Sequence, residues 1–441
     1  MIHIGFIQPS SDYLHDPFRG DPFTHLQILT VLENHFSSNV NLEFIDLRGV
    51  KKEFAVYHIP ECDIYLYSVY TLDYKEQVEI VGVLKSLYPK AIHIAGGPHA
   101  NTFPEESLNV FDALILGEGE RTIIQAIKDF INGRLKKIYK EAGIININDY
   151  PHWQRKYMRS SAVAKSNLMT QKRKPESRKI IGTTVMFSRG CPYNCHFCAI
   201  IHARKDTPGI RYRTPELIEQ EITYLKREYG IQGINLMDEI GIPLNKRTAV
   251  QHLEALGRSN VIWRGQCRVD GINPELAKLA KQSGCVALGL GVESVHQLSL
   301  DIINKKICTE QTVRTIRSIK EAGIEARLYM IMGLPAEPKD IVEKTWSFIQ
   351  ETQPDLVYLS IFTIRPGTEI YNHPDRFGIK SVSTEWEKTM HMHGRFGDET
   401  PLPTFEYHKE TPWGEGMSPE TIINNYLELQ KRLKENNLCS L

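Results

Sequence analysis

Three cysteines lie within one short segment of the chain, Cys191, Cys195 and Cys198, in the spacing C-x-x-x-C-x-x-C. Soft thiolates suit iron–sulfur clusters, and three on one loop can each bind one iron of a cubane and leave the fourth iron open. A structural zinc ion is the alternative, and its fourth ligand could come from His196 or a distant cysteine. The spacing and the aromatic Phe197 directly before the third cysteine favour a [4Fe–4S] cluster over zinc.

Length and composition limit the kinds of protein that can carry this loop. A chain of 441 residues exceeds the size at which one hydrophobic core stops growing, so two or three domains are expected. Hydrophobic residues make up 41% and charged residues 24%, as in ordinary soluble proteins. The 53 basic and 53 acidic side chains give a formal net charge of zero, which offers no global attraction to nucleic acid or to an anionic membrane.

The location of the protein is also constrained by its sequence. Residues 2–7 are expected to form a strand, since this segment is too short and uncharged for a signal peptide. No apolar run approaches the length of a transmembrane helix. Clustered cysteines in such a chain argue for a metal site in a reducing compartment. We therefore expect a cytoplasmic protein with no membrane or nucleic-acid partner.

Short apolar strands alternate with helical segments in residues 1–135. Strands are expected at 2–7, 42–47, 64–69, 91–95 and 113–116, and helices at 23–35, 75–87 and 120–132. This order predicts an α/β, Rossmann-like domain in which a parallel sheet carries helices on both faces. Such a domain binds its ligand at the carboxyl ends of the strands.

A second alternation of strands and helices follows a basic, polar interval at 136–179, which we expect to be a surface linker. Within residues 180–375, strands are expected at 182–187, 233–237, 261–266, 285–291, 326–332 and 356–363, and helices at 215–229, 246–256, 274–282, 310–322 and 340–351. These units predict a partial (β/α)6 barrel with its chemistry at the carboxyl-terminal face. Residues 376–441 are expected to form a C-terminal extension that ends in a helix at 419–434.

The cysteine loop resembles the signature of the radical S-adenosylmethionine (SAM) superfamily, C-x-x-x-C-x-aromatic-C. In that family the open iron chelates the amino and carboxylate groups of SAM, and one electron from the cluster cleaves the sulfonium to give a 5′-deoxyadenosyl radical. The resemblance implies that Cys191, Cys195 and Cys198 are the catalytic cluster ligands. It also implies that Phe197 lies near the adenine.

Segments at the ends of the barrel strands resemble the cobalamin-associated branch of this family. They are 236–239, 263–270, 289–294, 332–335 and 365–369, so the resemblance spans residues 180–370. It implies contacts with SAM for Asp238, Glu239, Arg268, Glu293, Ser294 and Arg327. The usual Gly-Gly-Glu is replaced here by Met-Asp-Glu, and a solvated acidic pair is the alternative there. Arg327 could pair with the SAM carboxylate, or it could be an ordinary surface arginine.

The first domain resembles the cobalamin-binding domain that is fused to many radical SAM enzymes. The matching segments are 63–71, 94–99, 103–105 and 112–120, and the resemblance implies cofactor contacts for Ser68, Gly96, Gly97, His99 and Glu118. Glycines at strand ends allow a bulky cofactor to approach the backbone. The Asp-x-His-x-x-Gly motif of base-off cobalamin proteins is missing, and His99 is either a cobalt neighbour or a hydrogen-bonding loop residue. The sequence therefore leaves open whether this domain binds cobalamin.

Other candidate groups are less specific. Cys267 and Cys285 lie on neighbouring predicted strands and are either hydrogen donors to a product radical or small buried hydrophobic residues. We expect the aromatic and histidine-rich part of the extension to be a lid or a packing segment, formed by Trp386, His391, His393, Arg395, Phe396, Phe405, Tyr407, His408 and Trp413.

These patterns together predict a radical SAM enzyme that acts on a small molecule and draws electrons from a reductant such as flavodoxin or ferredoxin. The leading prediction is cobalamin-dependent methylation of carbon. One alternative is a cobalamin-free dehydration or rearrangement of a sugar-like substrate, as in the aminoglycoside diol-dehydrating enzymes that the chain also resembles. A metal-stabilised binding protein without catalysis is the alternative of another class.

Overall fold

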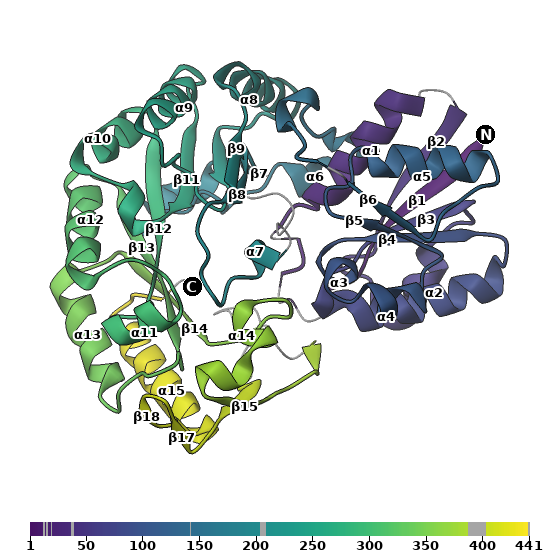
Figure 1. Ribbon diagram of the computed structural model, residues 1–441. Helices are drawn as coiled ribbons and strands as arrows, with labels where there is room; N and C mark the ends of the chain where they lie inside the picture. Colours follow the sequence, from purple (N-terminus) through teal and green to yellow (C-terminus); the bar gives the residue numbers. More distant parts are fainter. Residues whose placement is uncertain are drawn as a thin grey trace. The chain divides into compact units, whose positions relative to one another are not determined.

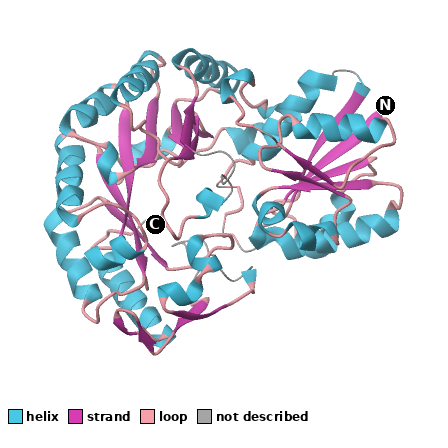
Figure 2. Ribbon diagram, viewed as in Figure 1, coloured by secondary structure: helices cyan, strands magenta, loops and turns pink. Residues whose placement is uncertain are grey.

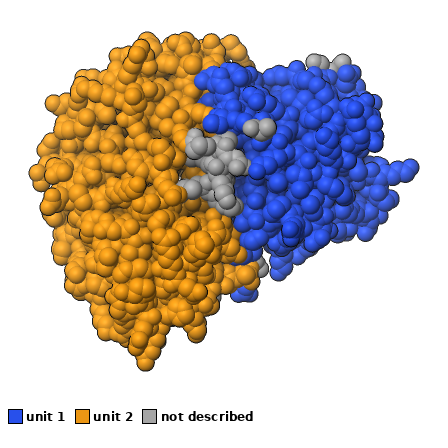
Figure 3. Space-filling view, viewed as in Figure 1, with its two compact units in different colours: residues 1–162, 202–208, 385–390 blue, residues 163–201, 209–384, 391–441 orange. Residues whose placement is uncertain are grey.

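The computed structural model describes residues 1–11, 14, 16–18, 20–36, 39–141, 143–202, 209–386 and 403–439. The chain divides into two compact units (Figure 3). Unit 1 comprises residues 1–162, 202–208 and 385–390, and unit 2 comprises residues 163–201, 209–384 and 391–441. Each unit is built around its own sheet. Among the described residues, no helix combines the length and the apolar character needed to cross a bilayer.

Unit 1 contains a parallel sheet. In its described part, six strands are hydrogen-bonded in the order β2-β1-β3-β4-β5-β6, and every neighbouring pair is parallel. The strands are β1 (Ile2–Gln8), β2 (Val40–Asp46), β3 (Ile64–Ser68), β4 (Ile92–Gly96), β5 (Ala113–Leu116) and β6 (Ile138–Lys140). The first five match the predicted segments closely, because each is a short apolar run between turn residues.

Helices cover both faces of this sheet (Figure 1). One face carries α1 (Phe23–Phe36) and α5 (Thr122–Ile131), and the other carries α2 (Tyr74–Leu87), α3 (Pro98–Thr102) and α4 (Pro104–Leu108). Successive side chains of β3 enter different cores: Ile64 and Leu66 join the core with Leu29 and Ile127, whereas Tyr65 and Tyr67 join the core with Ile80 and Leu84. The Rossmann-like fold predicted from the sequence is confirmed.

The strand order creates a natural ligand position in unit 1. Strand β1 lies between β2 and β3, so the connections after β1 and after β3 lead to opposite sides. In open α/β sheets, ligands bind at the carboxyl ends of the strands that flank such a reversal. Ser10 follows β1 and Ser68 ends β3, which places both residues at this edge.

The interval 136–179 is more structured than the expected surface linker. Its β6 extends the first sheet beside β5, and Arg155 is fully buried. The ring of Trp153 packs 4.4 Å from that of Phe23 on α1, and the Gln154 amide donates to Thr30 Oγ1 at 2.9 Å. The basic residues suggested a solvated face, but Arg155 is buried, and the exposed Lys156 pairs with Glu33 of α1.

Unit 2 is the partial barrel. In its described part, six parallel strands follow the order β14-β13-β12-β11-β10-β7 and leave an open sheet. The strands are β7 (Gly182–Val185), β10 (Gly233–Leu236), β11 (Ile262–Cys267), β12 (Cys285–Glu293), β13 (Glu325–Met332) and β14 (Leu356–Ile361). Between and after them come α8 (Pro215–Tyr229), α9 (Lys246–Arg258), α10 (Pro274–Gln282), α11 (Gln297–Ile302), α12 (Thr309–Glu321) and α13 (Ile341–Thr352). The helices line the outside of the curved sheet, as Figure 2 shows, and the predicted (β/α)6 arrangement is confirmed.

Local signals explain why several barrel helices begin where the sequence predicts. Thr214 precedes α8 and its Oγ1 accepts from the Leu217 amide at 3.5 Å, with Pro215 at the first helical position. Asn273 caps α10 in the same way, accepting from the Leu276 amide at 2.9 Å. Both helices therefore start at the predicted residue.

An antiparallel pair that the sequence analysis did not predict carries the first cysteine. Strand β8 (Ser188–Cys191) pairs with β9 (Gly209–Tyr212), with Cys191 opposite Gly209. Gly190 has φ +116°, and a Cβ at this position would collide with the carbonyl oxygen of Gly209. Glycine is therefore required for the close approach of the two strands.

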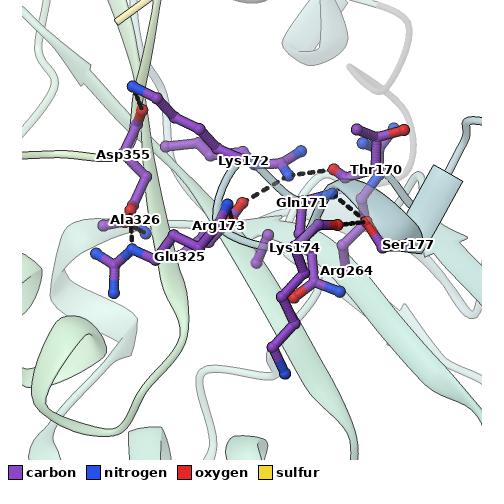
Figure 4. Close-up of polar contacts among 12 residues, drawn as sticks. Thr170, Gln171, Lys172, Arg173, Lys174, Ser177, Arg264, Glu325, Ala326 and Asp355 are labelled. Atoms are coloured by element: carbon purple, nitrogen blue, oxygen red, sulfur yellow. Dashed lines mark hydrogen bonds and ion pairs between the residues drawn. The ribbon is translucent and has the colours of Figure 1, made fainter. Parts of the chain in front are cut away.

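Residues 165–177, hereafter the strap, cover the amino-terminal end of the barrel sheet (Figure 4). A Cβ on Gly182 or Gly233 would lie 2.9 or 2.7 Å from Cγ of Met169, so the Met169 side chain fills the space at the start of β7 and β10. Arg173 pairs with Asp355 at 2.6 Å, and its amide donates to Glu325 Oε1 at 3.0 Å. These contacts fasten the strap to the beginnings of β13 and β14.

The described part of the C-terminal extension forms short strands and the expected final helix, and its role as a lid stays a prediction. The elements are β15 (Ile379–Val382), β16 (Phe405–Tyr407), β17 (Glu410–Thr411), β18 (Gly414–Glu415) and α15 (Pro419–Glu435). Helix α15 packs against α13 and β14 and buries Ile422, Leu429 and Leu433, so it joins the helical layer of the barrel. Residues His391, His393, Arg395 and Phe396 lie outside the described residues.

Candidate functional site

The cysteine loop follows β7 and β8 at the carboxyl end of the barrel sheet. A turn after α11 holds this loop in place. The His196 amide donates to the Ile303 carbonyl at 2.9 Å, and His196 Nδ1 lies 2.9 Å from the Ile302 carbonyl. Asn304 Nδ2 donates to the Asn194 carbonyl at 2.6 Å. The backbone of the loop is therefore fixed by the segment between α11 and α12.

The thiols of the loop are free and only partly exposed. Cys195 is buried, whereas Cys191 and Cys198 are half-buried. Burial raises the pKa of the Cys198 thiol to about 11. Burial also raises the pKa of Cys195, where the nearby cations of Lys305 and Arg268 act in the opposite direction. Thiols in such surroundings become thiolates when they bind a metal.

The spacing of the thiols bears on the kind of metal site. Among the described residues, no three His, Cys, Asp or Glu side chains gather closely enough to hold a single metal ion. In a cubane each thiolate binds a different iron, so the sulfur atoms lie farther apart than around one zinc ion. The loop is thus compatible with a cluster, and the role of the three cysteines stays a prediction.

Asp238 and Glu239 follow β10 at the same edge of the barrel. Asp238 is 3% exposed, and its Oδ1 and Oδ2 accept from the Phe187 amide at 3.1 and 3.2 Å. Burial raises the pKa of Asp238 to about 7, so the carboxyl can hold a proton near neutrality. Glu239 is half-buried beside it. The Asp238 carbonyl also accepts from Gln266 Nε2 of β11 at 3.0 Å, which ties two strand ends together.

Glu293 ends β12 in a strained conformation. Its φ is +64°, and the pairing with β13 shifts register at this residue. A glutamate in the left-handed region is uncommon and is typical of functional sites. Its Oε1 lies 2.6 Å from Nζ of Lys305, and both side chains are buried. The strain therefore places a charged pair beside the cysteine loop.

Ser294 points toward the half-buried carboxylate of Glu337. Ser294 Oγ donates to Glu337 Oε1 at 3.3 Å, and the Gly333 amide donates to Oε2 at 2.8 Å. Loss of solvent raises the pKa of Glu337 to about 8. Tyr407 of β16 donates its hydroxyl to the Gly333 carbonyl at 2.9 Å. The C-terminal extension thus contacts the loop after β13.

Arg327 is not brought to this site. It lies opposite Gly289 and Leu356 near the beginning of β13, and its Nη2 donates to the Thr170 carbonyl at 2.8 Å and pairs with Glu325 at 3.0 Å. These partners belong to the amino-terminal end of the barrel, whereas the cysteine loop lies at the carboxyl end. The prediction that Arg327 pairs with the SAM carboxylate is therefore wrong. The alternative of a surface arginine is wrong as well, because the side chain is buried.

Other predicted residues of unit 2 are placed as follows. Phe197 is half-buried and packs against the core of unit 2. Arg268 reaches the cysteine loop from the end of β11, with Nη1 3.9 Å from Cys195 Sγ. Cys267 and Cys285 are fully enclosed in the same core, as small hydrophobic residues are.

The predicted residues of unit 1 gather at the carboxyl ends of β3, β4 and β5. Ser68 is buried, and within the described part of the chain its Oγ has no hydrogen-bond partner. Gly96 ends β4 and its carbonyl accepts from the Val69 amide at 2.8 Å. Gly97 has φ +94°, and a Cβ there would lie 2.8 Å from the nitrogen and 2.9 Å from the oxygen of Val69. Glu118 is half-buried in the loop after β5.

His99 is buried at the start of α3. Its ring stacks on Tyr74 with centroids 3.9 Å apart, and its Nδ1 lies 3.3 Å from Thr71 Oγ1. Burial lowers the pKa of His99 to about 4, so the ring is neutral. These contacts match the hydrogen-bonding alternative considered for this histidine. The alternative that His99 lies next to the cobalt of a bound cobalamin stays a prediction.

The sequence analysis missed several residues that the structure brings to the two sites. They are Ser10 in unit 1, and Tyr193, Asp270, Lys305 and Glu337 in unit 2. Tyr193 and Asp270 lie inside motifs that were recognised, but nothing in their spacing marks them as partners. Lys305 and Glu337 lie in loops, where only tertiary contacts reveal a role.

Comparison with known proteins agrees with this geometry. Residues 185–349 match the model of the radical SAM superfamily. The chain is 28% identical over 347 residues to an uncharacterized methyltransferase of Pyrococcus horikoshii, covering 76% of this chain and 72% of the relative. It is 26% identical over 314 residues to the anaerobic magnesium-protoporphyrin IX monomethyl ester cyclase of Cereibacter sphaeroides, covering 66% of this chain and 50% of that enzyme.

Among solved structures, the fold resembles the radical SAM methyltransferase TsrM of Kitasatospora setae, solved with cobalamin and a [4Fe–4S] cluster. The TM-score is 0.64 at 18% identity, and the match covers 86% of this chain and 79% of TsrM. The likeness extends through both units, so it includes the Rossmann-like sheet as well as the barrel. The cysteine loop, its place at the carboxyl end of a partial barrel and the matched family model agree that the chain carries a radical SAM domain over residues 185–349.

Proposed function

We propose that this protein is a cobalamin-dependent radical SAM methyltransferase that transfers a methyl group to a carbon atom of a small molecule. The observation that carries the proposal is the pairing of two cofactor-type edges in one chain. Unit 2 offers three free thiols at the carboxyl end of a partial barrel. Unit 1 offers buried hydroxyls that have no hydrogen-bond partner among the described residues, beside a tight glycine turn at the carboxyl end of β4.

The donor set of the cysteine loop fits a [4Fe–4S] cluster. Cys191, Cys195 and Cys198 would hold three irons, and the buried cations of Arg268 and Lys305 would balance the negative charge of the thiolates. When bound, the reduced cluster supplies the electron that cleaves SAM, and cobalamin carries a methyl group. The protein itself binds, orients and shields these groups.

Two charged groups of the barrel edge suit the amino acid part of SAM. Asp238 and Glu239 would receive its ammonium group, because carboxylates accept charge-assisted hydrogen bonds. Binding of an ammonium beside Asp238 would favour the ionised carboxylate over the protonated form that burial favours in the free protein. Ser294, oriented by Glu337, would contribute a hydroxyl to the same molecule.

The reversal of strand order in unit 1 fits a polar ligand of cobalamin type. Ser10 follows one of the two strands that flank the reversal and Ser68 ends the other, both are buried, and among the described residues neither hydroxyl has a hydrogen-bond partner. Buried polar groups without partners are uncommon in folded proteins and are satisfied by bound ligands or water. The missing side chain of Gly97 lets the turn after β4 pack directly against the backbone of Val69, which follows β3, so the two strand ends that carry the proposed ligand edge are held together.

The experiment is anaerobic purification, iron and sulfide reconstitution, and incubation with SAM and dithionite. Formation of 5′-deoxyadenosine is measured by mass spectrometry, and hydroxocobalamin is supplied to half of the samples before desalting. We expect wild-type protein to form deoxyadenosine and retain corrinoid. We expect Cys195→Ala to form none, and the matched variant Cys308→Ala, which removes an exposed cysteine, to behave like wild type.

The outcomes separate the alternatives. If the protein forms deoxyadenosine but retains no corrinoid, the proposed methylation is wrong, and a cobalamin-free dehydration or rearrangement takes its place. A cluster-loaded protein that never cleaves SAM would point to a metal-stabilised binding protein. We further propose that the protein works in the cytoplasm, where flavodoxin or ferredoxin supplies electrons, and that reduced flavodoxin can replace dithionite in this assay.

A further inference from the structure

Arg268 is held in one orientation at the end of β11. Its Nε lies 2.8 Å from Asp270 Oδ1, and its Nη2 lies 3.1 Å from Oδ2 of the same carboxylate. Nη2 also donates to the Lys305 carbonyl at 2.8 Å. The residue is 5% exposed, so these bonds compete with little water. Two-point pairing of a planar guanidinium with a carboxylate fixes its direction as well as its distance.

The cysteine loop supplies the cover for this guanidinium. The centroid of the Tyr193 ring lies 3.4 Å from Cζ of Arg268, and the Tyr193 hydroxyl donates to Asp270 Oδ2 at 2.8 Å. Tyr193 therefore contacts both the cation and its counter-ion. Stacking of arginine on an aromatic face is favourable, and more so away from water.

One edge of the guanidinium faces the cysteines. With Nε and Nη2 engaged by Asp270 and Lys305, Nη1 lies 3.9 Å from Sγ of Cys195. Sulfur is a weak acceptor as a thiol, but as a metal-bound thiolate it carries negative charge and accepts strongly. Hydrogen bonds and positive charge beside the sulfur atoms of an iron–sulfur cluster stabilise its reduced, more negative state.

We propose that Arg268 is a positioning residue that donates a hydrogen bond to the Cys195 thiolate and raises the reduction potential of the cluster, with Tyr193 and Asp270 fixing its orientation. This inference rests on the proposed cluster at Cys191, Cys195 and Cys198. The step affected is the uptake of one electron by the cluster from a low-potential one-electron reductant, namely dithionite in the test. No bond of the protein forms or breaks in this step.

The role differs from the contact with SAM that the sequence motif suggested for Arg268. Nε, Nη1 and Nη2 are each directed at a protein group, and one face of the cation is covered by Tyr193. The geometry therefore directs this arginine toward the cluster ligand. Asp270 allows a second test of the same charge. Neutralising Asp270 removes the negative charge that offsets the Arg268 guanidinium, so the net positive charge beside the cluster increases.

The test is an anaerobic redox titration of reconstituted protein, with the reduced cluster measured by electron paramagnetic resonance and iron and sulfide measured in the same samples. In Arg268→Gln we expect the midpoint potential to become more negative, with an at least about fivefold lower ratio of reduced to oxidised cluster at a fixed potential. In Asp270→Asn we expect the opposite shift. Arg268→Lys, which keeps the charge but loses the fork, should fall between wild type and Arg268→Gln.

A matched control removes an exposed arginine from the same unit. Arg258→Gln on α9 breaks a surface pair with Glu219, with the atoms 2.7 Å apart, and should leave the midpoint unchanged. Midpoint shifts of opposite sign in Arg268→Gln and Asp270→Asn, at wild-type iron content, would support the inference. A loosened cysteine loop would not shift the two midpoints in opposite directions. Unchanged midpoints would overturn it. If Arg268→Gln loads no iron, Asp270→Asn decides, and a wild-type protein without a cluster would instead refute the proposed function.

Discussion

Glu293 and Lys305 form a buried ion pair, with Oε1 and Nζ 2.6 Å apart, although the glutamate adopts a backbone conformation that its residue type disfavours. Lys305→Met would leave a carboxylate without its partner in surroundings poor in water. We expect this change to lower the free energy of unfolding of unit 2 by about 3–5 kcal/mol. Urea unfolding of the apoprotein, followed by circular dichroism, measures the effect.

The control for this prediction is a lysine–glutamate pair on the surface of the same unit. Lys246 and Glu275 also lie close, at 2.7 Å, but both side chains are mostly exposed. Lys246→Met should cost less than about 1 kcal/mol. The double variant Glu293→Gln with Lys305→Met should recover much of the lost stability, because no charge is then left buried. Equal costs for Lys305→Met and Lys246→Met would contradict the assigned burial energy.

Asp238 predicts a pH dependence of stability. Burial raises its pKa from 3.8 to about 7. Between these two pH values the folded protein keeps a proton on Asp238 that the unfolded chain has released. Stability contributed by this group is therefore present at low pH and declines as pH rises from about 4 to about 7. Asp238→Asn cannot ionise and still offers an oxygen to the Phe187 amide. The free energy of unfolding of Asp238→Asn minus that of wild type should therefore increase by about 1–3 kcal/mol between pH 5 and pH 7.5.

Urea midpoints at the two pH values test this prediction. Parallel pH profiles for wild type and Asp238→Asn would show that the carboxyl titrates near its ordinary pKa in the folded protein. SAM binding measured on the same samples adds an independent check. Loss of affinity in Asp238→Asn, in spite of equal or higher stability, would separate a role in binding from a role in folding.

Much of the fold follows from local sequence patterns. The strand segments of both sheets are short apolar runs, and helices α8 and α10 begin at capped prolines, so their positions could be predicted to within a few residues. The pair β8–β9 and the strap could not be predicted. Their residues are polar, basic or glycine-rich, and they are ordered by contacts with distant elements such as Asp355 and Glu325.

The candidate site divides in the same way. Cys191, Cys195 and Cys198 are marked by spacing alone, because ligands on one loop must keep fixed intervals. Arg327 shows the limit of motif transfer: its residue type suits a carboxylate partner, but the register of β13 places it at the opposite end of the barrel. Lys305 and Glu337 carry no motif and are recognised only through their contacts.

Gly97 offers a test of the ligand site in unit 1. Its φ is +94°, and a Cβ on this residue would lie only 2.8 Å from the backbone nitrogen of Val69, so there is no room for a side chain. Gly97→Ala should therefore strain the end of β4 and destabilise unit 1 by about 2–4 kcal/mol. We expect reconstituted Gly97→Ala to retain less corrinoid after desalting while its iron content and deoxyadenosine formation stay at wild-type levels, since the cysteine loop belongs to unit 2.

Gly82 provides the matched substitution. It lies inside α2, and a Cβ there would meet no atom within 4 Å, so Gly82→Ala should stabilise unit 1 by about 0.5–1 kcal/mol and leave corrinoid retention unchanged. Lower retention in Gly97→Ala alone would tie corrinoid binding to the carboxyl end of β4. Equal retention in both variants would mean that the corrinoid, if retained at all, is held away from this glycine. Because strain and binding are read separately, by unfolding and by absorbance after desalting, a merely unstable variant is distinguishable from one that has lost its ligand.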